Sequence, residues 1–329
     1  MKDKNQTSME RSNKIILNLL NKHFLSKSNL IIFLCLFFSV NTLNAQQEPM
    51  YSQYMFNMIQ INPAYAGNRA VDNITTIYRN QWVGIKGAPT TANISWDKRL
   101  EGSNVGYGLQ VYNDHLGIES SSGLQAFYSY RLPFQKSCLT FGLSAGVLNY
   151  NAAFSHVITT QEGDPLFQEL TNGWLPTVGI GALYATDNCY IGLSVPALLQ
   201  TKIYSNTYQV TSGANIHYFL TSGYIFNASE ILKIKPSILI KVVKGAPVQC
   251  DFNVNSWIND KIGLGMSYRT GDSFVGMFEI QLSPDLRLGY AYDYTISNLK
   301  SYSNGTHELM LRFELNNKKD QEILSPRYY

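Results

Sequence analysis

The sequence predicts an all-β protein, a transmembrane antiparallel β-barrel of about fourteen strands. Three observations predict it: apolar and polar residues alternate strictly, short and long connections alternate, and charge is sparse. From Asp285 to Tyr294, Leu and Tyr occupy one parity, whereas Asp, Arg, Gly and Ala occupy the other. Thr306 to Leu315 repeats this arrangement. Successive side chains of a strand point to opposite faces, so both stretches have one apolar and one polar face.

The alternation recurs along most of the chain. The expected strands are residues 72–82, 90–99, 103–114, 121–131, 136–150, 174–187, 188–196, 211–226, 230–243, 247–257, 260–270, 273–281, 285–295 and 306–315. Taken alone, a two-faced strand fits either a half-buried strand of a soluble sheet or a barrel strand with lipid outside and water inside.

The connections decide between these alternatives. Counted from the first strand, the even connections are short, as at Glu101-Gly102, Asp187-Asn188 and Asn259-Asp260. Several odd connections are longer, notably 151–173, 197–210 and 297–305. Short turns on one side and long loops on the other are typical of bacterial outer-membrane barrels, in which both termini are periplasmic. An even strand number also lets the last strand pair with the first.

The composition agrees with a membrane barrel. Charged residues make up 15% of the chain, below the roughly 25% usual for soluble domains. The 22 tyrosines and 24 glycines suit extended strands with interfacial aromatics. The net charge of +3 falls to near zero once the basic amino terminus is removed, so nothing favours nucleic-acid binding. Outer-membrane lipid is the expected surrounding.

The first 45 residues resemble a secretory signal peptide. An apolar core from Leu30 to Val40 follows basic residues, and Ala45 precedes a plausible cleavage point. The core is shorter than the roughly 20 residues that a spanning helix needs, although an uncleaved anchor is the alternative. We therefore expect residues 1–45 to be removed, 46–71 to form a periplasmic or plug segment, 72–315 to form the barrel, and 316–329 to form a periplasmic tail.

The segment that precedes the first strand has a different pattern. Apolar residues between Tyr51 and Ile59 fall at the spacing of one helix face, and Pro63 begins a turn-like stretch. The prediction is a short amphipathic helix and loop at the periplasmic mouth. A barrel of about fourteen strands leaves room for water, a plug or a ligand, so charged lumen residues are expected to be solvated or paired.

No pattern of catalytic or metal-binding residues is present in the sequence. Adjacent side chains such as Asp114 and His115 point oppositely on a strand, and no activated nucleophile accompanies them. The Gly-x-Gly pairs 179–181 and 263–265 open no helix and are expected on the inner face of the barrel. The cysteines lack zinc spacing. We predict a protein that is not an enzyme and that has no catalytic residues, cofactor or metal site.

Aromatic residues in or beside the longer predicted loops are candidate contacts for a partner. They are Phe154, Phe167, Trp174, Tyr204 and Tyr208. Interfacial residues at the level of the lipid headgroups are the alternative interpretation.

Several motifs resemble those of the PorP/SprF family of the type IX secretion system in Bacteroidetes-type bacteria. The motifs are Tyr51–Asn57, Asn62–Gly67, Tyr78–Gly84, Gly87–Thr90, Asn113–Gly117, Gly305–Leu309 and Ser325–Tyr329. The amino-terminal motif is specific, and the resemblance covers essentially the whole mature chain. Its signature residues, a possible plug or partner contact, are Tyr51, Gln53, Tyr54, Asn57, Asn62, Pro63, Ala64, Tyr65 and Gly67.

The resemblance implies a non-enzymatic outer-membrane barrel that serves secretion or gliding motility. It further implies a secreted adhesin-like cargo with a type IX C-terminal signal domain and other type IX components as partners. The alternative function on the same barrel is a channel or transporter for small or hydrophobic solutes.

Overall fold

The structure, a computed structural model, describes residues 50–69, 71–153, 170–199 and 216–315. The described residues between 50 and 244 and between 248 and 315 belong to one compact unit, which contains the barrel, and residues 245–247 are part of a turn.

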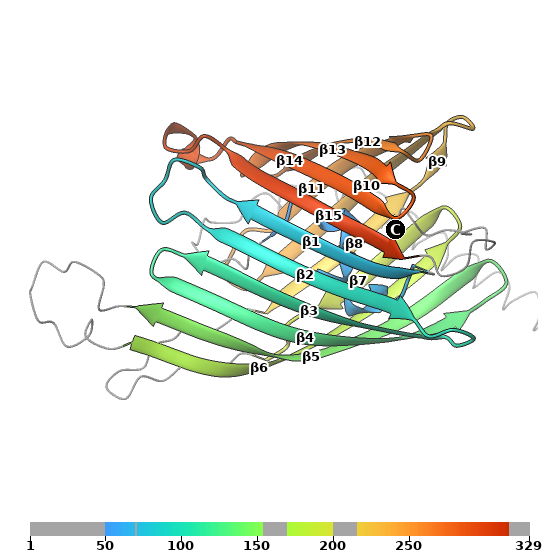
Figure 1. Cartoon of the computed structure of the whole chain (residues 1–329), viewed down its shortest axis with the longest axis horizontal. Helices are drawn as coiled ribbons and strands as arrows, with labels where there is room; N and C mark the ends of the chain where they lie inside the picture. The colour runs from blue at the N-terminus through green and yellow to red at the C-terminus, as the bar shows by residue number, and fades with distance from the viewer. Residues whose placement is uncertain (1–49, 70, 154–169, 200–215, 316–329) are drawn as a thin grey trace, which may run out of the picture. The chain divides into compact units, whose positions relative to one another are not determined.

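The strands form one closed antiparallel barrel (Figure 1). They are β1 (Asp72–Asn80), β2 (Thr90–Arg99), β3 (Val105–Leu116), β4 (Glu119–Pro133), β5 (Ser137–Ala153), β6 (Leu170–Thr186), β7 (Cys189–Val195), β8 (His217–Tyr224), β9 (Phe226–Asn227), β10 (Leu232–Val243), β11 (Gln249–Ile258), β12 (Ile262–Arg269), β13 (Ser273–Ser283), β14 (Leu286–Thr295) and β15 (Thr306–Leu315). β9 continues β8 after a break at Ile225, and both pair with β10. Fourteen strand positions therefore surround the lumen, as predicted.

Two pairings close the barrel. β1 pairs with β15 from Asp72↔Leu315 to Asn80↔His307, and β10 pairs with β11. The β1–β15 pairing joins the first strand to the last. Within the described residues the sheet therefore has no free edge for another chain to extend. We call the end at which β1 finishes the long-loop end, and the end at which β1 begins the short-turn end.

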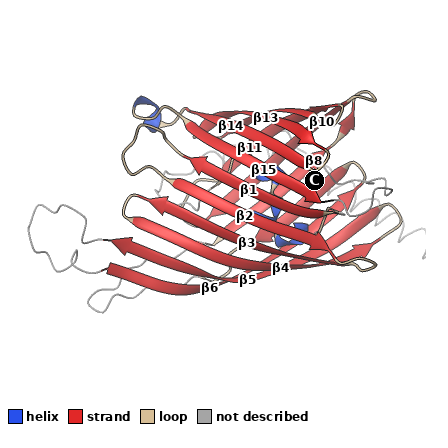
Figure 2. Ribbon diagram, viewed as in Figure 1, coloured by secondary structure: helices blue, strands red, loops and turns tan. Residues whose placement is uncertain are grey.

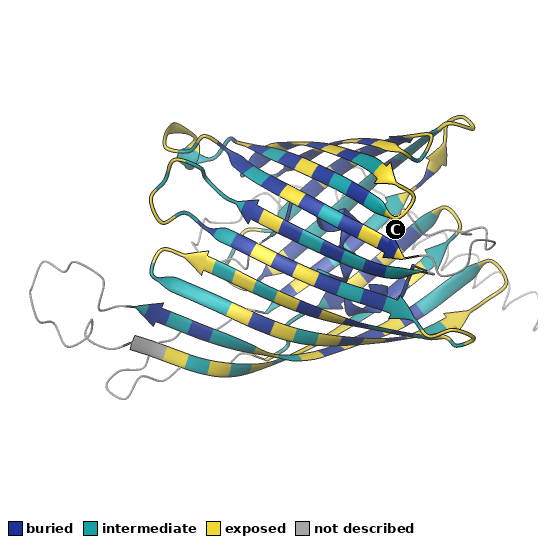
Figure 3. Ribbon diagram, in the orientation of Figure 1, coloured by how far each residue is buried: buried dark blue, intermediate teal, exposed yellow. Residues whose placement is uncertain are grey.

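Burial alternates along the strands, and the alternation fixes which face is which (Figure 3). In β15, Glu308, Met310 and Arg312 are buried, whereas Leu309 and Phe313 are exposed. The apolar parity thus faces outward to lipid, and the charged parity faces the lumen, as the sequence predicts. Helical turns are few and short beside the strands (Figure 2). No helix among the described residues is long and apolar enough to cross a membrane.

The expected loop 151–173 is shorter than predicted. β5 and β6 remain paired as far as Ala153↔Leu170, and Asn149 Nδ2 donates to Asn172 Oδ1 across the pair at 2.8 Å. Here the outward parity carries Asn149 and Asn151 while Tyr150 and Ala152 are buried on the other face, so the pattern of apolar outward residues ends although the backbone ladder continues. The predicted boundary was wrong for that reason.

Replacing an outward-facing leucine by arginine should destabilise the barrel. Leu143 lies in the middle of β5 and is 56% exposed on the lipid face. Leu143→Arg is expected to cost about 2–4 kcal/mol, since a guanidinium near the bilayer midplane loses its hydration. Reversible unfolding from phospholipid vesicles measures this cost.

Phe134→Arg is the matched control, because Phe134 is 59% exposed but lies in the β4–β5 turn. There the cost should be at most about 1 kcal/mol. Equal costs at the two positions would contradict the assignment of the outward face to lipid.

Candidate functional site

Residues 50–69, the lumen segment, lie inside the barrel (Figure 1). The predicted amphipathic helix at the mouth is wrong. The segment forms three separate 3₁₀ turns, Tyr54–Phe56, Met58–Gln60 and Pro63–Tyr65. An amphipathic helix needs one face in water. The wall of the barrel buries the polar residues Ser52, Gln53 and Asn57 as completely as their apolar neighbours.

The start of the segment is held by a buried ionic network near the long-loop end. Arg79 of β1 lies 2.8 Å from Asp293 of β14 and 2.9 Å from Glu308 of β15. The two oxygens of Glu308 accept the backbone N–H groups of Ser52 and Gln53, each at 2.8 Å. Ser52 Oγ donates to Asp293 at 2.6 Å. Arg79 thereby neutralises two carboxylates, and these carboxylates in turn bind the backbone and the Ser52 hydroxyl of the entering segment.

The middle of the segment combines apolar packing with single polar contacts to the wall. Asn253 Nδ2 of β11 donates to Tyr54 Oη at 2.7 Å, and Asn57 Nδ2 donates to Ser95 Oγ of β2 at 2.9 Å. The Phe56 ring meets the Trp257 ring edge to face at 6.5 Å. The segment is fixed to opposite sides of the lumen.

Asn62 anchors the third turn. Its Oδ1 accepts from the Ala64 N–H at 2.9 Å, and Pro63 occupies the first position of the turn. Its Nδ2 donates to the Ala182 carbonyl of β6 at 3.1 Å and to the Leu193 carbonyl of β7 at 3.4 Å. One amide thus caps the turn and joins it to two wall strands.

Glycines of the wall leave room for this turn. A Cβ on Gly181 would lie 2.0 Å from Asn62 Oδ1, and one on Gly142 would lie 2.1 Å from the Ala64 nitrogen. The prediction that the Gly-x-Gly pairs line the inner face is confirmed. At Gly181 and Gly142 a larger residue would displace the lumen segment, whereas Gly263 and Gly265 lie against side chains of the neighbouring wall strands.

The segment leaves the lumen at the short-turn end. Gly67 has a φ of 61° and donates its N–H to Asp97 Oδ2 at 3.0 Å. Arg99 Nε donates to the Gly67 carbonyl at 3.1 Å, and Arg131 donates to the Asn68 carbonyl at 3.3 Å. Asp97 and these arginines come from β2 and β4, so the exit is fixed on one side of the barrel.

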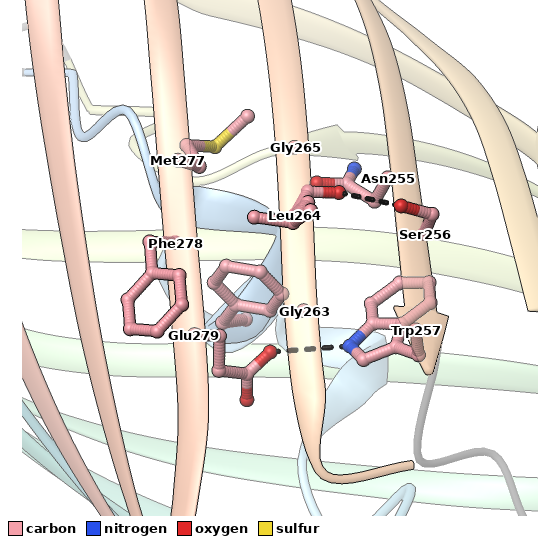
Figure 4. A pocket seen from close by; sticks show the side chains of 10 residues that line it. Asn255, Ser256, Trp257, Gly263, Leu264, Gly265, Met277, Phe278 and Glu279 are labelled. Atoms are coloured by element: carbon pink, nitrogen blue, oxygen red, sulfur yellow. Dashed lines mark hydrogen bonds between the residues drawn. The ribbon is translucent and has the colours of Figure 1, made fainter. Parts of the chain in front are cut away.

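A second ionic network lines the lumen between these anchors. Glu279 of β13 lies 3.3 Å from Arg287, forms an ion pair with Arg312, and accepts from Trp257 Nε1 at 3.2 Å (Figure 4). Arg312 also donates to the Phe56 carbonyl at 3.3 Å. Phe56, Trp257, Met277 and Glu279 line a narrow pocket beside this network. The lumen charges are thus paired rather than solvated.

The structure places the predicted signature residues and the predicted loop aromatics in different parts of the molecule. Tyr51 to Gly67 all belong to the buried lumen segment. Among its long-range partners, Asp293 and Glu308 carry charges that the alternation already places in the lumen, whereas Ser95 and Asn253 give no such signal in the sequence. Trp174 is 71% exposed on the outward face of β6, a position that fits both interpretations. Phe154, Phe167, Tyr204 and Tyr208 lie outside the described residues.

The residues weighed for catalysis do not form a site. Asp114 faces the lumen and accepts from Thr91 Oγ1 at 2.5 Å, whereas His115 is exposed on the opposite face of β3. Cys138, Cys189 and Cys250 are free thiols near strand ends. Within the described ranges, no group of three His, Cys, Asp or Glu residues could hold a metal.

The closed fourteen-stranded barrel with a lipid-facing apolar surface defines an outer-membrane β-barrel protein. The model of one family, described as type IX secretion system membrane protein PorP/SprF, matches residues 43–313. The chain therefore belongs to the PorP/SprF family, and its place is with the other type IX components at the outer membrane.

Solved structures of low identity are similar in outline. The Ralstonia pickettii toluene transporter TbuX is 10% identical with a TM-score of 0.47 and covers 84% of this chain and 97% of its own. Omp33 of Acinetobacter baumannii is 9% identical with a TM-score of 0.45 and covers 76% and 100%. The KdgM porin is 10% identical with a TM-score of 0.38 and covers 74% and 99%. A search of curated proteins finds no match.

Removal of Arg79 should destabilise the barrel strongly. Arg79→Met leaves Asp293 and Glu308 buried without their cation, a loss that costs about 3–5 kcal/mol. Lys233→Met is the control, because its ion pair with Asp260 at 2.9 Å is partly exposed and should contribute at most about 1 kcal/mol. The free energy of unfolding of both variants in vesicles is compared. A cost for Arg79→Met no larger than that for Lys233→Met would contradict a stabilising role of the buried network.

A substitution at Gly67 tests the exit of the lumen segment. Gly67→Ala combines left-handed strain with a Cβ 2.5 Å from the Lys98 carbonyl oxygen, and it should cost about 3 kcal/mol or more. Gly102 has a similar φ of 66° but open space around its Cα. Gly102→Ala should therefore cost only the strain, about 1–2 kcal/mol. Protease cleavage within residues 50–69 of the folded barrel should increase in the first variant alone.

Proposed function

We propose that this barrel docks or anchors a secreted adhesin-like protein at the cell surface, through the type IX C-terminal signal domain of that partner. Family membership supports the link to secretion. The observation that carries the proposal is the lumen segment, which hydrogen-bonds to β1, β2, β4, β6, β7, β11, β14 and β15. A barrel fixed internally in this way suits a rigid attachment site.

The orientation follows from the loops. We infer that the long-loop end faces the cell exterior and that the short-turn end faces the periplasm, as in other bacterial barrels. β15 ends at the short-turn end, so the tail after Leu315 is proposed to be periplasmic. The predicted periplasmic position of the amino terminus concerns residues before 50, which lie outside the described ranges.

The same observation disfavours the channel or transporter. Tyr54, Met55 and Phe56 pack against Trp257 and Met310 in one buried cluster that crosses the lumen. This packing supports a lumen that is filled by the segment in this region rather than left as a channel.

Deletion of the gene should abolish the surface display of one or a few proteins that carry a type IX C-terminal signal domain. Those partners lose their attachment site, whereas small-solute permeability should not change if the lumen segment closes the barrel as proposed. Protease treatment of intact cells followed by mass spectrometry measures display, with the complemented strain as the control.

Unchanged display after deletion would overturn the docking proposal. Conductance of the purified barrel in planar bilayers tests the alternative independently. A stable open pore would favour the channel, whereas the lumen segment predicts no stable conductance.

A further inference from the structure

Three loops that carry family-like motifs meet at the long-loop end. They are residues 81–89 between β1 and β2, 117–118 between β3 and β4, and 296–305 between β14 and β15, here called the rim platform (Figure 1). The Val83 N–H donates to the Gly305 carbonyl at 2.9 Å, and the Asn304 N–H donates to the Val83 carbonyl at 2.7 Å. The Gly117 N–H donates to the Gly87 carbonyl at 2.9 Å. Backbone hydrogen bonds thus join loops that are distant in sequence.

The loops approach one another too closely for side chains to separate them. A Cβ on Gly87 would lie 3.3 Å from Gly117 Cα, and Gly87 has a φ of 78°. A Cβ on Gly84 would lie 3.3 Å from Asn304 Nδ2. These contacts make the platform a built surface rather than three independent connections.

Trp82 is held in a strained conformation within the platform. Its φ of 45° is uncommon for a residue other than glycine, and costly for a bulky one. The Trp82 N–H donates to Thr306 Oγ1 at 3.1 Å, and its carbonyl accepts from the Ile85 N–H at 3.1 Å. Strain of this kind persists only where surrounding contacts impose it, and it gathers at functional sites.

The exposed side chains of the platform are aromatic, aliphatic and basic. Tyr302 is 74% exposed, and Leu116, at the adjoining end of β3, is 45% exposed. Lys86 and Lys300 are exposed, and Lys300 Nζ lies 5.4 Å from the centre of the Tyr294 ring. The nearby carboxylates Asp293 and Glu308 are buried against Arg79 and present no charge to the surface. The three loops themselves carry Lys86 and Lys300 and no carboxylate, and the adjoining Glu119 and Asp272 are only partly exposed.

We propose that the rim platform is the docking surface for the secreted partner, and that it recognises a face of the partner that combines apolar and acidic side chains. This inference rests on the proposed function and deepens it. Aromatic anchors with flanking charges are typical of protein interfaces. Charge complementarity selects acidic residues on the partner.

Photo-crosslinking tests the location. A photoreactive amino acid at Tyr302 or Leu116 should form an adduct with a secreted protein whose display depends on this chain. Phe134 and Leu282 are equally exposed controls at the short-turn end and should form none. Adducts with that protein from the control positions alone, adducts with lipid alone, or the absence of any such adduct would overturn the inference.

Charge reversal tests the chemistry. In the full chain, Lys86→Glu with Lys300→Glu should reduce display of the partner by roughly tenfold, because attraction becomes repulsion. Lys86→Arg with Lys300→Arg should keep it. Lys136→Glu with Lys261→Glu, exposed residues of short turns, is the matched control and should display normally.

The two proposals fail in different ways. Normal display by the Lys86→Glu, Lys300→Glu variant, at wild-type barrel abundance in the outer membrane, would overturn the platform while deletion of the gene still abolished display. Normal display after deletion of the gene would overturn the proposed function itself.

Discussion

The structure depends on how a wide barrel satisfies the charges on its inner wall. Fourteen strands enclose a lumen that wall side chains alone do not fill, and buried charges without partners are costly. Glu308 shows the solution: it faces Arg79 from the neighbouring strand and accepts two backbone N–H groups of the lumen segment. The segment is therefore part of the core of the barrel, and wall and segment satisfy each other.

The barrel wall and the lumen segment are complementary in size as well as in charge. Where the segment carries a ring or a turn close to the wall, the wall carries glycine, as Gly181 does against Asn62 and Gly142 does against Ala64. Elsewhere the wall supplies Ser95 or Ser129, whose hydroxyl groups bond to Asn57 and to the Ala66 carbonyl. Small and polar residues on the inward parity thus reflect a filled lumen, although the same composition would also fit an open, hydrated one.

Because the inward residues fit either a filled or a hydrated lumen, the sequence predicts the strands but not the position of the lumen segment. Strand order and the outward face follow from local alternation, as in Leu309 and Phe313 of β15, because a period of two is visible within ten residues. The position of the lumen segment is not local. Ser52 bonds to Glu308 across a sequence separation of 256 residues, and no periodicity encodes such a contact. The apolar spacing between Tyr51 and Ile59 was therefore interpreted as a helix, although those residues face different sides of the lumen.

The ionic network and the rim platform are linked through the same strands. Arg79 lies three residues before Trp82 along the chain, and Glu308 lies two residues after Thr306, whose hydroxyl accepts the Trp82 N–H. The ion pairs of Arg79 therefore fix the ends of β1 and β15 from which the strained loop departs. A docking surface gains affinity when its loops are ordered before the partner arrives, because less conformational entropy is lost on binding. On this argument the lumen segment contributes to docking without touching the partner, by holding rigid the strand ends that carry the platform.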